Sequence, residues 1–267
     1  MSGHASEISD GDVLLQEDLD GISTLTLNRP HQYNALSSDL LTTLQNALDE
    51  ISHNDATGVV IIAANGKAFC PGHDLKEMRS SEDKAFHQAL FNQCGKMMLT
   101  INQMPQPVIA QVNGIATAAG CQLVANCDLA VATEDARFAV SGINAGLFCS
   151  TPAVPLSRNL PRKQAMQMLL TGDFISADTA LRFGLINEIV KPDELQQATR
   201  NLAAKIVAKS PLAIKLGKEM FYKQLLMDLS EAYAYAAEKM ACNMDSDDAR
   251  EGIDAFIEKR KPEWKGC

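Results

Sequence analysis

The sequence predicts an α/β protein in which helices flank a parallel or mixed sheet and a nearly all-helical region follows. The run from Val59 to Ala64 is continuously apolar, which is typical of a strand buried on both faces. Segment 37–51 repeats its apolar residues at spacings of three and four, as an amphipathic helix does. From Pro192 onward, helical spacing persists almost to the end of the chain. We therefore expect a core at 13–191 and a C-terminal helical region at 192–267.

The composition is that of an ordinary globular protein. The chain has 267 residues, of which 46% are hydrophobic and 21% are charged, so it can bury a large core. Its formal net charge of -9 argues against nucleic acid or an anionic membrane surface as the main partner. No apolar run approaches the roughly 20 residues that a membrane span needs.

The first elements can be placed from local patterns. Segment 21–27 alternates apolar and polar residues, which indicates a strand, and Asn28-Arg29-Pro30 ends it. Ser37 or Ser38 is suited to cap the helix that ends near Ile51. A second helical pattern runs from Asp83 to Met104 and is closed by prolines.

The stretch from Pro107 to Thr133 reads as strand, turn, helix and strand. An apolar run breaks at Asn113-Gly114, and the small residues Ala116 to Gly120 follow. Small residues let the backbone N–H groups of a helix N-terminus approach a ligand, and those groups favour negative charge. The same residues would equally allow tight packing of a helix on a strand, so both interpretations stay open.

The second half of the chain is mostly helical. The periodicity predicts a short strand at 185–190 and helices at 162–170, 176–183, 195–209, 211–240 and 245–258. The beginning, residues 1–12, is polar and acidic and resembles neither a signal peptide nor a transit peptide, so we expect a flexible N-terminus.

The seven cysteines are odd in number and scattered, which favours free thiols in a reducing compartment and no metal site. Cys149 stands just before a predicted helix, a setting that lowers thiol pKa. No histidine follows His87, however, so packing is a better explanation of Cys149 than nucleophilic catalysis.

A series of motifs in order along the chain resembles the crotonase superfamily, the enoyl-CoA hydratase/isomerase family. These motifs are Asn28-Arg29-Pro30, Tyr33-Asn34-Ala35-Leu36, the run from Lys67 to Leu75 (KAFCPGHDL), Pro107 to Ala110, Asn113-Gly114, Gly120-Cys121, Leu170-Thr171-Gly172, Ala177, Ala180, Gly184-Leu185-Ile186 and the run from Ala255 to Pro262. The resemblance covers Gly11 to Lys265.

The resemblance implies a spiral core of ββα units and a C-terminal helical trimerisation region, hence a homotrimer or a dimer of trimers. It also implies a mitochondrial protein of fatty-acid metabolism whose ligand is an acyl-CoA thioester, with coenzyme A as part of that ligand and no separate cofactor. Carried over by position, the two backbone N–H donors of the oxyanion hole fall on His73 and Ala119. Such preorganised donors stabilise an enolate or a tetrahedral oxyanion.

The family's catalytic carboxylates are missing. Hydratases that this chain resembles use two glutamates, and the matching positions hold Gln122 and Gly142. An amide can orient water but cannot accept a proton near neutral pH, and glycine has no side chain. His73 is the best alternative base, because an unperturbed imidazole titrates near pH 6.5.

The resemblance also places coenzyme A. Besides His73 and Ala119, the positions that match its binding residues are Ala35, Leu36, Asp74, Leu75, Lys76 and Lys259. Asp74 is equally suited to cap the next helix, and Lys259 lies in a basic run that also fits a solvated helix end.

Three functions remain. The first is an acyl-CoA-binding protein without conventional hydratase activity. The second is an enzyme of the family that uses a different base on another acyl-CoA. The third is a non-catalytic structural or regulatory subunit.

Overall fold

Two β-sheets lie at the centre of the protein, which a computed structural model describes over residues 12–267. Residues 1–11, most of the predicted flexible N-terminus, lie outside the described part. The larger sheet has the strand order β1-β2-β3-β5-β7-β10, and only the β1–β2 pair is antiparallel. Its strands are Leu14–Leu19, Ile22–Leu27, Val59–Ala64, Val108–Val112, Leu129–Thr133 and Glu188–Val190 in chain order.

The smaller sheet has the order β4-β6-β8-β9. Its strands are Ala68–Cys70, Ile115–Thr117, Arg137–Ala139 and Ile175–Ser176, and the first three are mutually parallel. Along the chain, β3, β5 and β7 of the larger sheet are each followed by one strand of the smaller sheet and then by helix. Three successive ββα units therefore build the core, which confirms the predicted spiral.

Helices cover both faces of the larger sheet. On one face, the main hydrophobic cluster joins β2, β3 and β5 to α1 (Ser38–Ser52), α3 (Lys84–Gln103) and α4 (Ala119–Asn126). The α1 helix begins where predicted, because the Ser37 hydroxyl accepts a hydrogen bond from the Leu40 N–H, and its leucines are fully buried. On the other face, α8 (Leu195–Val207) packs against β3, β5 and β7.

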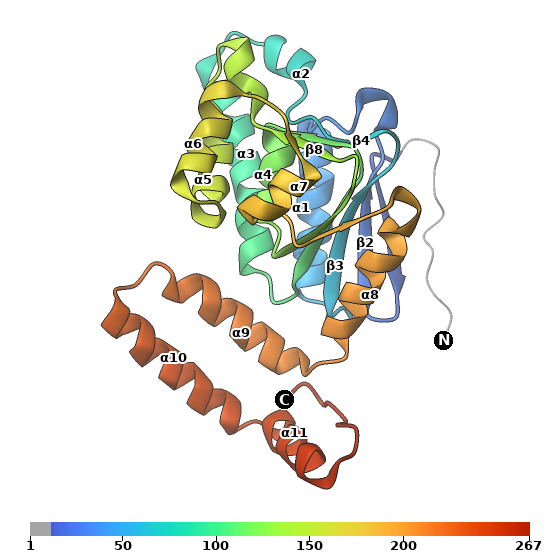
Figure 1. Cartoon of the computed structure of the whole chain (residues 1–267), viewed down its shortest axis with the longest axis vertical. Helices are drawn as coiled ribbons and strands as arrows, with labels where there is room; N and C mark the ends of the chain where they lie inside the picture. Colours follow the sequence, from blue (N-terminus) through green and yellow to red (C-terminus); the bar gives the residue numbers. More distant parts are fainter. Residues whose placement is uncertain (1–11) are drawn as a thin grey trace.

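The last three helices stand apart from this core. They are α9 (Pro211–Gln224), α10 (Leu229–Met244) and α11 (Asp247–Glu258), and they lie below the sheets in Figure 1. We call residues 211–267 the C-terminal arm. The predicted boundary near Pro192 falls too early in the chain, because α8 belongs to the core and the arm begins only at Pro211.

The remaining helices lie near the smaller sheet or follow it in the chain: α2 (Leu75–Arg79), α5 (Ser150–Asn159), α6 (Arg162–Thr171) and α7 (Ala177–Phe183). Short 3-10 turns occupy Pro30–Gln32, Ser141–Ala145 and Pro192–Glu194. Within residues 12–267, no helix is both long enough and apolar enough to cross a membrane.

Candidate functional site

The three parallel strands of the smaller sheet bring three chain segments to one edge. β4 ends at Cys70 and leads to Gly72 and His73, and β6 ends at Thr117 and leads to Ala119. β8 ends at Ala139 and leads to Gly142. Since β6 pairs with both neighbours, the residues that follow these strands gather at the carboxyl edge, where ligands of open α/β sheets bind.

The first candidate donor is the backbone N–H of His73. Leu36 forms a parallel β-bridge with His73, in which the Leu36 N–H donates to the Gly72 carbonyl (2.8 Å) and the Asp74 N–H donates to the Leu36 carbonyl (3.0 Å). In such a bridge the flanking residues take both hydrogen bonds, so the N–H of His73 itself points away from Leu36. Within residues 12–267, no backbone carbonyl accepts from it.

The second candidate donor is the N–H of Ala119, the first residue of α4. First-turn N–H groups have no partner inside their own helix, and no backbone carbonyl among the described residues accepts this one. The preceding Ala118 has φ 48° and ψ −119°, angles that usually require glycine at the first central position of a type II′ turn. Ala118 is therefore strained, and this strained turn sets the direction of the Ala119 N–H.

The two donor segments lie directly against each other. The Thr117 hydroxyl donates to the Pro71 carbonyl (2.8 Å) and ties the two turns together. A Cβ atom on Gly72 would lie 3.1 Å from the Ala119 nitrogen and 2.9 Å from the Ala118 Cβ. Gly72 also has φ +104°, which L side chains rarely adopt. Glycine at position 72 thus keeps the space beside the Ala119 N–H open.

The start of α4 is pressed onto β4. A Cβ atom on Gly120 would lie only 2.0 Å from the Cys70 carbonyl oxygen, so this position admits no side chain. Every residue of α4 is buried, including Gln122, which is 3% exposed. The small residues 116–120 therefore allow close packing, and the N–H of Ala119 has no backbone partner in the described part of the chain, so both interpretations of this stretch stay open.

The two positions that lack glutamate have different surroundings. The Gln122 side-chain oxygen is buried and has no hydrogen-bond partner among the described residues. At Gly142, an added Cβ would lie 2.7 Å from both the Cys149 Sγ and the Leu147 carbonyl oxygen. Any side chain at position 142 would therefore force the 142–149 segment to move.

The His73 side chain turns toward α3. Its ring meets Phe91 edge-on, with ring centroids 5.4 Å apart, and its Nε2 has no hydrogen-bond partner in the described chain. Burial lowers the pKa of His73 to about 4, against an opposing effect of the nearby Glu77 carboxylate. The imidazole is consequently neutral near pH 7, and it is a weaker base than an exposed histidine.

A hydrogen-bond network holds the loop that carries Ala35 and Leu36. The Arg29 guanidinium donates to the Ala35 carbonyl and to the side chains of Gln32 and Asp74. Asp74 also accepts from the N–H groups of Lys76 and Glu77, which confirms it as the cap of α2. Burial would raise the pKa of Asp74, but these donors together lower it.

The structure separates the residues expected to contact coenzyme A into three groups. Leu75 and Lys76 are exposed on α2, whereas Ala35 and Leu36 are buried, so Leu36 orders the loop through its backbone and offers no surface to a ligand. Lys259 follows α11, which lies at the opposite end of the molecule from α2 in Figure 1. One chain therefore does not bring Lys259 together with Lys76.

The buried thiols near the site are not set up for nucleophilic attack. Burial raises the pKa of Cys149, with the Gly142 N–H opposing it, so the helix that follows does not produce the lowered pKa expected from the sequence. Burial also raises the pKa of Cys70 and of Cys121 to about 12, and both are core residues. No cluster of three or more potential metal ligands occurs within residues 12–267.

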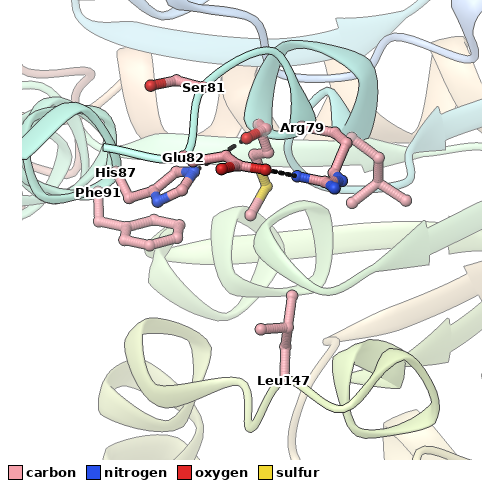
Figure 2. A pocket seen from close by; sticks show the side chains of 8 residues that line it. Arg79, Ser81, Glu82, His87, Phe91 and Leu147 are labelled. Carbon is pink, nitrogen blue, oxygen red and sulfur yellow. Dashed lines mark hydrogen bonds and ion pairs between the residues drawn. The ribbon is translucent and has the colours of Figure 1, made fainter. Parts of the chain in front are cut away.

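A cavity of about 690 Å³ opens beside this edge, and no sequence pattern indicated it. It lies between α2, α3 and the loop before α5, as Figure 2 shows. Its lining residues are Leu75, Met78, Arg79, Ser81, Glu82, His87, Phe91 and Leu147. Phe91 lines the cavity, and its ring also contacts the His73 ring. The cavity therefore lies next to the residue that carries the first candidate donor.

Comparisons with known proteins agree on one family. The family model "Enoyl-CoA hydratase/isomerase" matches residues 17–267. The chain is 46% identical to enoyl-CoA hydratase domain-containing protein 3, mitochondrial, of Rattus norvegicus over 92% of this chain and 82% of that protein. A solved enoyl-CoA hydratase of Mycobacterium smegmatis is 54% identical with a TM-score of 0.93, covering 95% of this chain and 99% of the other. The solved human enoyl coenzyme A hydratase domain-containing protein 3 is 46% identical with a TM-score of 0.92, covering 95% and 100%.

Proposed function

The chain belongs to the enoyl-CoA hydratase/isomerase family, and within that family we propose that it binds an acyl-CoA thioester without conventional hydration. The observation that carries this proposal is the pair of adjoining turns at His73 and Ala119, each with a backbone N–H that no backbone carbonyl of residues 12–267 accepts. Two donors at one point are what a thioester oxygen requires.

Binding of a thioester needs only the two donors, whereas hydration also needs a base, and the three positions considered for that base are poorly suited to it. Gln122 cannot accept a proton, and the loop leaves no room for a carboxylate at Gly142. His73 is the remaining candidate base of the second hypothesis, and its unpartnered Nε2 favours that role. A pKa of about 4 nevertheless makes this imidazole a poor proton acceptor near pH 7. Binding is therefore better supported than turnover.

The cellular setting and the assembly follow from the relatives and from the arm. Relatives named mitochondrial support a mitochondrial location, and a role in fatty-acid metabolism is part of the proposal. Exposed apolar side chains on the arm support association with another copy, since one chain leaves them in contact with water, and the assembly that we propose is a homotrimer or a dimer of trimers. In such an assembly, Lys259 of a neighbouring copy would be available to coenzyme A where one chain cannot supply it.

The first experiment compares two ligands by titration calorimetry. An acyl-CoA thioester and the S-alkyl thioether of the same length differ only in the carbonyl oxygen that the donors would hold. We expect the thioester to bind about tenfold more tightly, since two hydrogen bonds each contribute about 0.5–1.5 kcal/mol. Equal affinities would show that the two N–H groups do not bind the thioester oxygen.

A matched pair of variants tests whether the preference for the thioester depends on the turn at Gly72. Gly72→Ala puts a methyl group beside the Ala119 nitrogen and should abolish the preference for the thioester. Gly95→Ala, whose added Cβ meets nothing within 4 Å, should preserve it. Crotonyl-CoA hydration is followed by the loss of its ultraviolet absorbance, and a turnover of about 10 per second or more would contradict the proposal. If no thioester binds at millimolar concentration, the non-catalytic subunit is the function that remains.

A further inference from the structure

We propose that the Arg29 side chain is a positioning residue for the oxyanion hole, and that it holds the backbone N–H of His73 in the direction that a thioester oxygen requires. In this role Arg29 touches no ligand and acts through Ala35 and Asp74. The inference rests on the proposed function, because it concerns how the first of the two donors is aimed.

The direction of the His73 N–H depends on one isolated β-bridge. Leu36 takes both hydrogen bonds of this bridge, one from the Asp74 N–H (3.0 Å) and one to the Gly72 carbonyl (2.8 Å). The bridge lies outside the strands of both sheets, so a ladder of further residue pairs does not support it. Other contacts must therefore keep Leu36 opposite His73.

The loop that carries Leu36 is anchored at its start by Asn34. This residue has φ 62°, a left-handed conformation that asparagine tolerates better than most residues. Its side chain is fully buried and donates to the carbonyls of Asn65 (2.8 Å) and Ala68 (2.9 Å). Its oxygen accepts from the Arg29 N–H (2.8 Å). These bonds fix the loop two residues before the bridge and leave the bridge itself to other groups.

The Arg29 guanidinium contacts both sides of the bridge. On one side it donates to the carbonyl of Ala35, the residue before Leu36. On the other side it donates to the carboxylate of Asp74, the residue after His73, at 3.3 Å. A planar guanidinium holds two acceptors in a fixed relative geometry, which a lysine ammonium does not. Arg29 thus clamps together the two segments whose alignment directs the His73 N–H.

The ion pair is sheltered and fully used. The side chains of Arg29 and Asp74 are only 15% and 16% exposed, so water screens this pair less than a surface pair. Asp74 Oδ2 faces the guanidinium, while Oδ1 accepts from the N–H groups of Lys76 (3.0 Å) and Glu77 (3.3 Å). Both carboxylate oxygens of the residue that follows His73 are therefore held.

The test measures, by titration calorimetry, the affinities of the wild type and of Arg29→Lys for an acyl-CoA thioester and for its thioether analogue. Thioether affinity reports every contact except those of the carbonyl oxygen, so the ratio of the two affinities isolates the donors. Arg29→Lys should lower the thioester-to-thioether ratio about threefold, because one of two comparable hydrogen bonds is lost.

The outcomes distinguish this inference from the proposed function. If the wild type prefers the thioester and Arg29→Lys lowers the ratio by less than about twofold, well below the loss of one hydrogen bond, the inference is overturned and the proposed function stands. If the wild type itself has no preference, the oxyanion hole and this inference fail together. If Arg29 only stabilises the fold, Arg29→Lys will melt at a lower temperature and weaken both ligands equally, which also overturns the inference.

Two further variants serve as a second probe and a control. Asp74→Asn keeps a side-chain oxygen to cap α2 but replaces the carboxylate that the guanidinium contacts, so it should lower the ratio as well. Arg200→Lys alters a different arginine–carboxylate pair, with Glu17 at 2.9 Å, where α8 meets β1. This control should keep the ratio of the wild type.

Infrared difference spectroscopy of a thioester with an isotopically labelled carbonyl gives a readout that does not depend on affinity. Two donors polarise the bound carbonyl and lower its stretching frequency. In Arg29→Lys this band should move back toward that of the free thioester. An unchanged band would mean that the His73 N–H is still aimed at the oxygen, and the inference would be wrong.

Discussion

The core and the C-terminal arm are held together in different ways. The core buries two apolar clusters against the two faces of its larger sheet. The arm contributes one residue, Ala255, to the buried hydrophobic set, and its other buried residues are Lys218 and Asp248, which are charged. Apolar burial therefore stabilises the core, whereas polar contacts fix the arm to it.

Lys218 is the main polar contact between the two regions. Its ammonium group donates to the carbonyls of Ile101 and Gln106 and to the Asp128 carboxylate, at 2.7–2.8 Å. Asp128 also accepts from the Tyr222 hydroxyl and from the Val108 N–H. Burial lowers the pKa of Lys218, and the Asp128 carboxylate opposes that shift. One lysine of α9 thus provides hydrogen bonds for two carbonyls at and after the end of α3 and for the carboxylate that precedes β7.

Glycine substitutions should show the largest contrast between the two regions. Gly120→Ala in the core drives a methyl group to 2.0 Å from the Cys70 carbonyl oxygen, so we expect a loss of about 5 kcal/mol of unfolding free energy, or no folded protein. Gly217→Ala in α9 meets nothing within 4 Å and should stabilise the helix by about 0.5–1 kcal/mol. Denaturant unfolding of both variants measures the difference. A tolerated Gly120→Ala would mean that α4 can move away from β4.

Removing the polar contact should have the next largest effect. Lys218→Met leaves Asp128 partly buried without its cation, and we expect a loss of about 3 kcal/mol. Lys223→Met, which breaks an exposed pair with Glu219, should change stability by less than about 0.5 kcal/mol. Hydrogen exchange should accelerate in α9 of the first variant and not in the sheet. If α9 exchange is unchanged, the arm is held by contacts other than Lys218.

Acid should affect the two regions at different pH values. The pKa of His73 is lowered to about 4 in the folded protein, so the stability it contributes is complete above its unfolded pKa near 6.5 and is lost as pH falls through 4. A difference of about 2.5 pKa units corresponds to at most about 3.4 kcal/mol. The unfolding free energy of His73→Phe should therefore depend less on pH between 6.5 and 4 than that of the wild type, which denaturant unfolding at stepped pH measures.

The arm should respond only at lower pH. Hydrogen bonds from Lys223 and Arg260 lower the pKa values of Glu219 and Glu251 to about 2. Their contribution is present above an unfolded pKa near 4.5 and is lost as pH falls toward 2. Loss of arm protection already at pH 6 would contradict this order, and hydrogen exchange at stepped pH measures it.

Long, strongly patterned elements could be predicted from the sequence. The Val59–Ala64 strand and the Ser37 cap of α1 are confirmed, since each depends on residues that are local in the chain. The strands β4, β6 and β8 were not predicted, because three residues carry no measurable alternation. The predicted helix 211–240 is wrong: the chain breaks between α9 and α10 and α10 ends at Met244, although no glycine or proline marks the break.

The existence of a helix could be predicted more easily than the part of the protein against which it packs. Helical spacing predicted both α8 and α9, and only tertiary packing shows that α8 belongs to the sheet. Some residues of the candidate site could likewise be predicted from the sequence, and others could not. Family motifs indicated His73 and Ala119, whereas Phe91 and Leu147 reach the cavity from segments that carry no motif. The obstruction at Gly142 depends on Cys149, seven residues away, and could not be read from either position alone.

The backbone angles of Ala118 suit a D-residue better than an L-residue. Its angles of 48° and −119° are the mirror image of −48° and 119°, which are ordinary for an L-residue. A D-alanine introduced by chemical ligation would adopt the present conformation without the penalty of about 1–3 kcal/mol that an L-residue carries in a sparsely populated backbone region. The direction of the Ala119 N–H thus depends on an α-carbon whose natural chirality opposes it, and the surrounding fold holds that α-carbon in place.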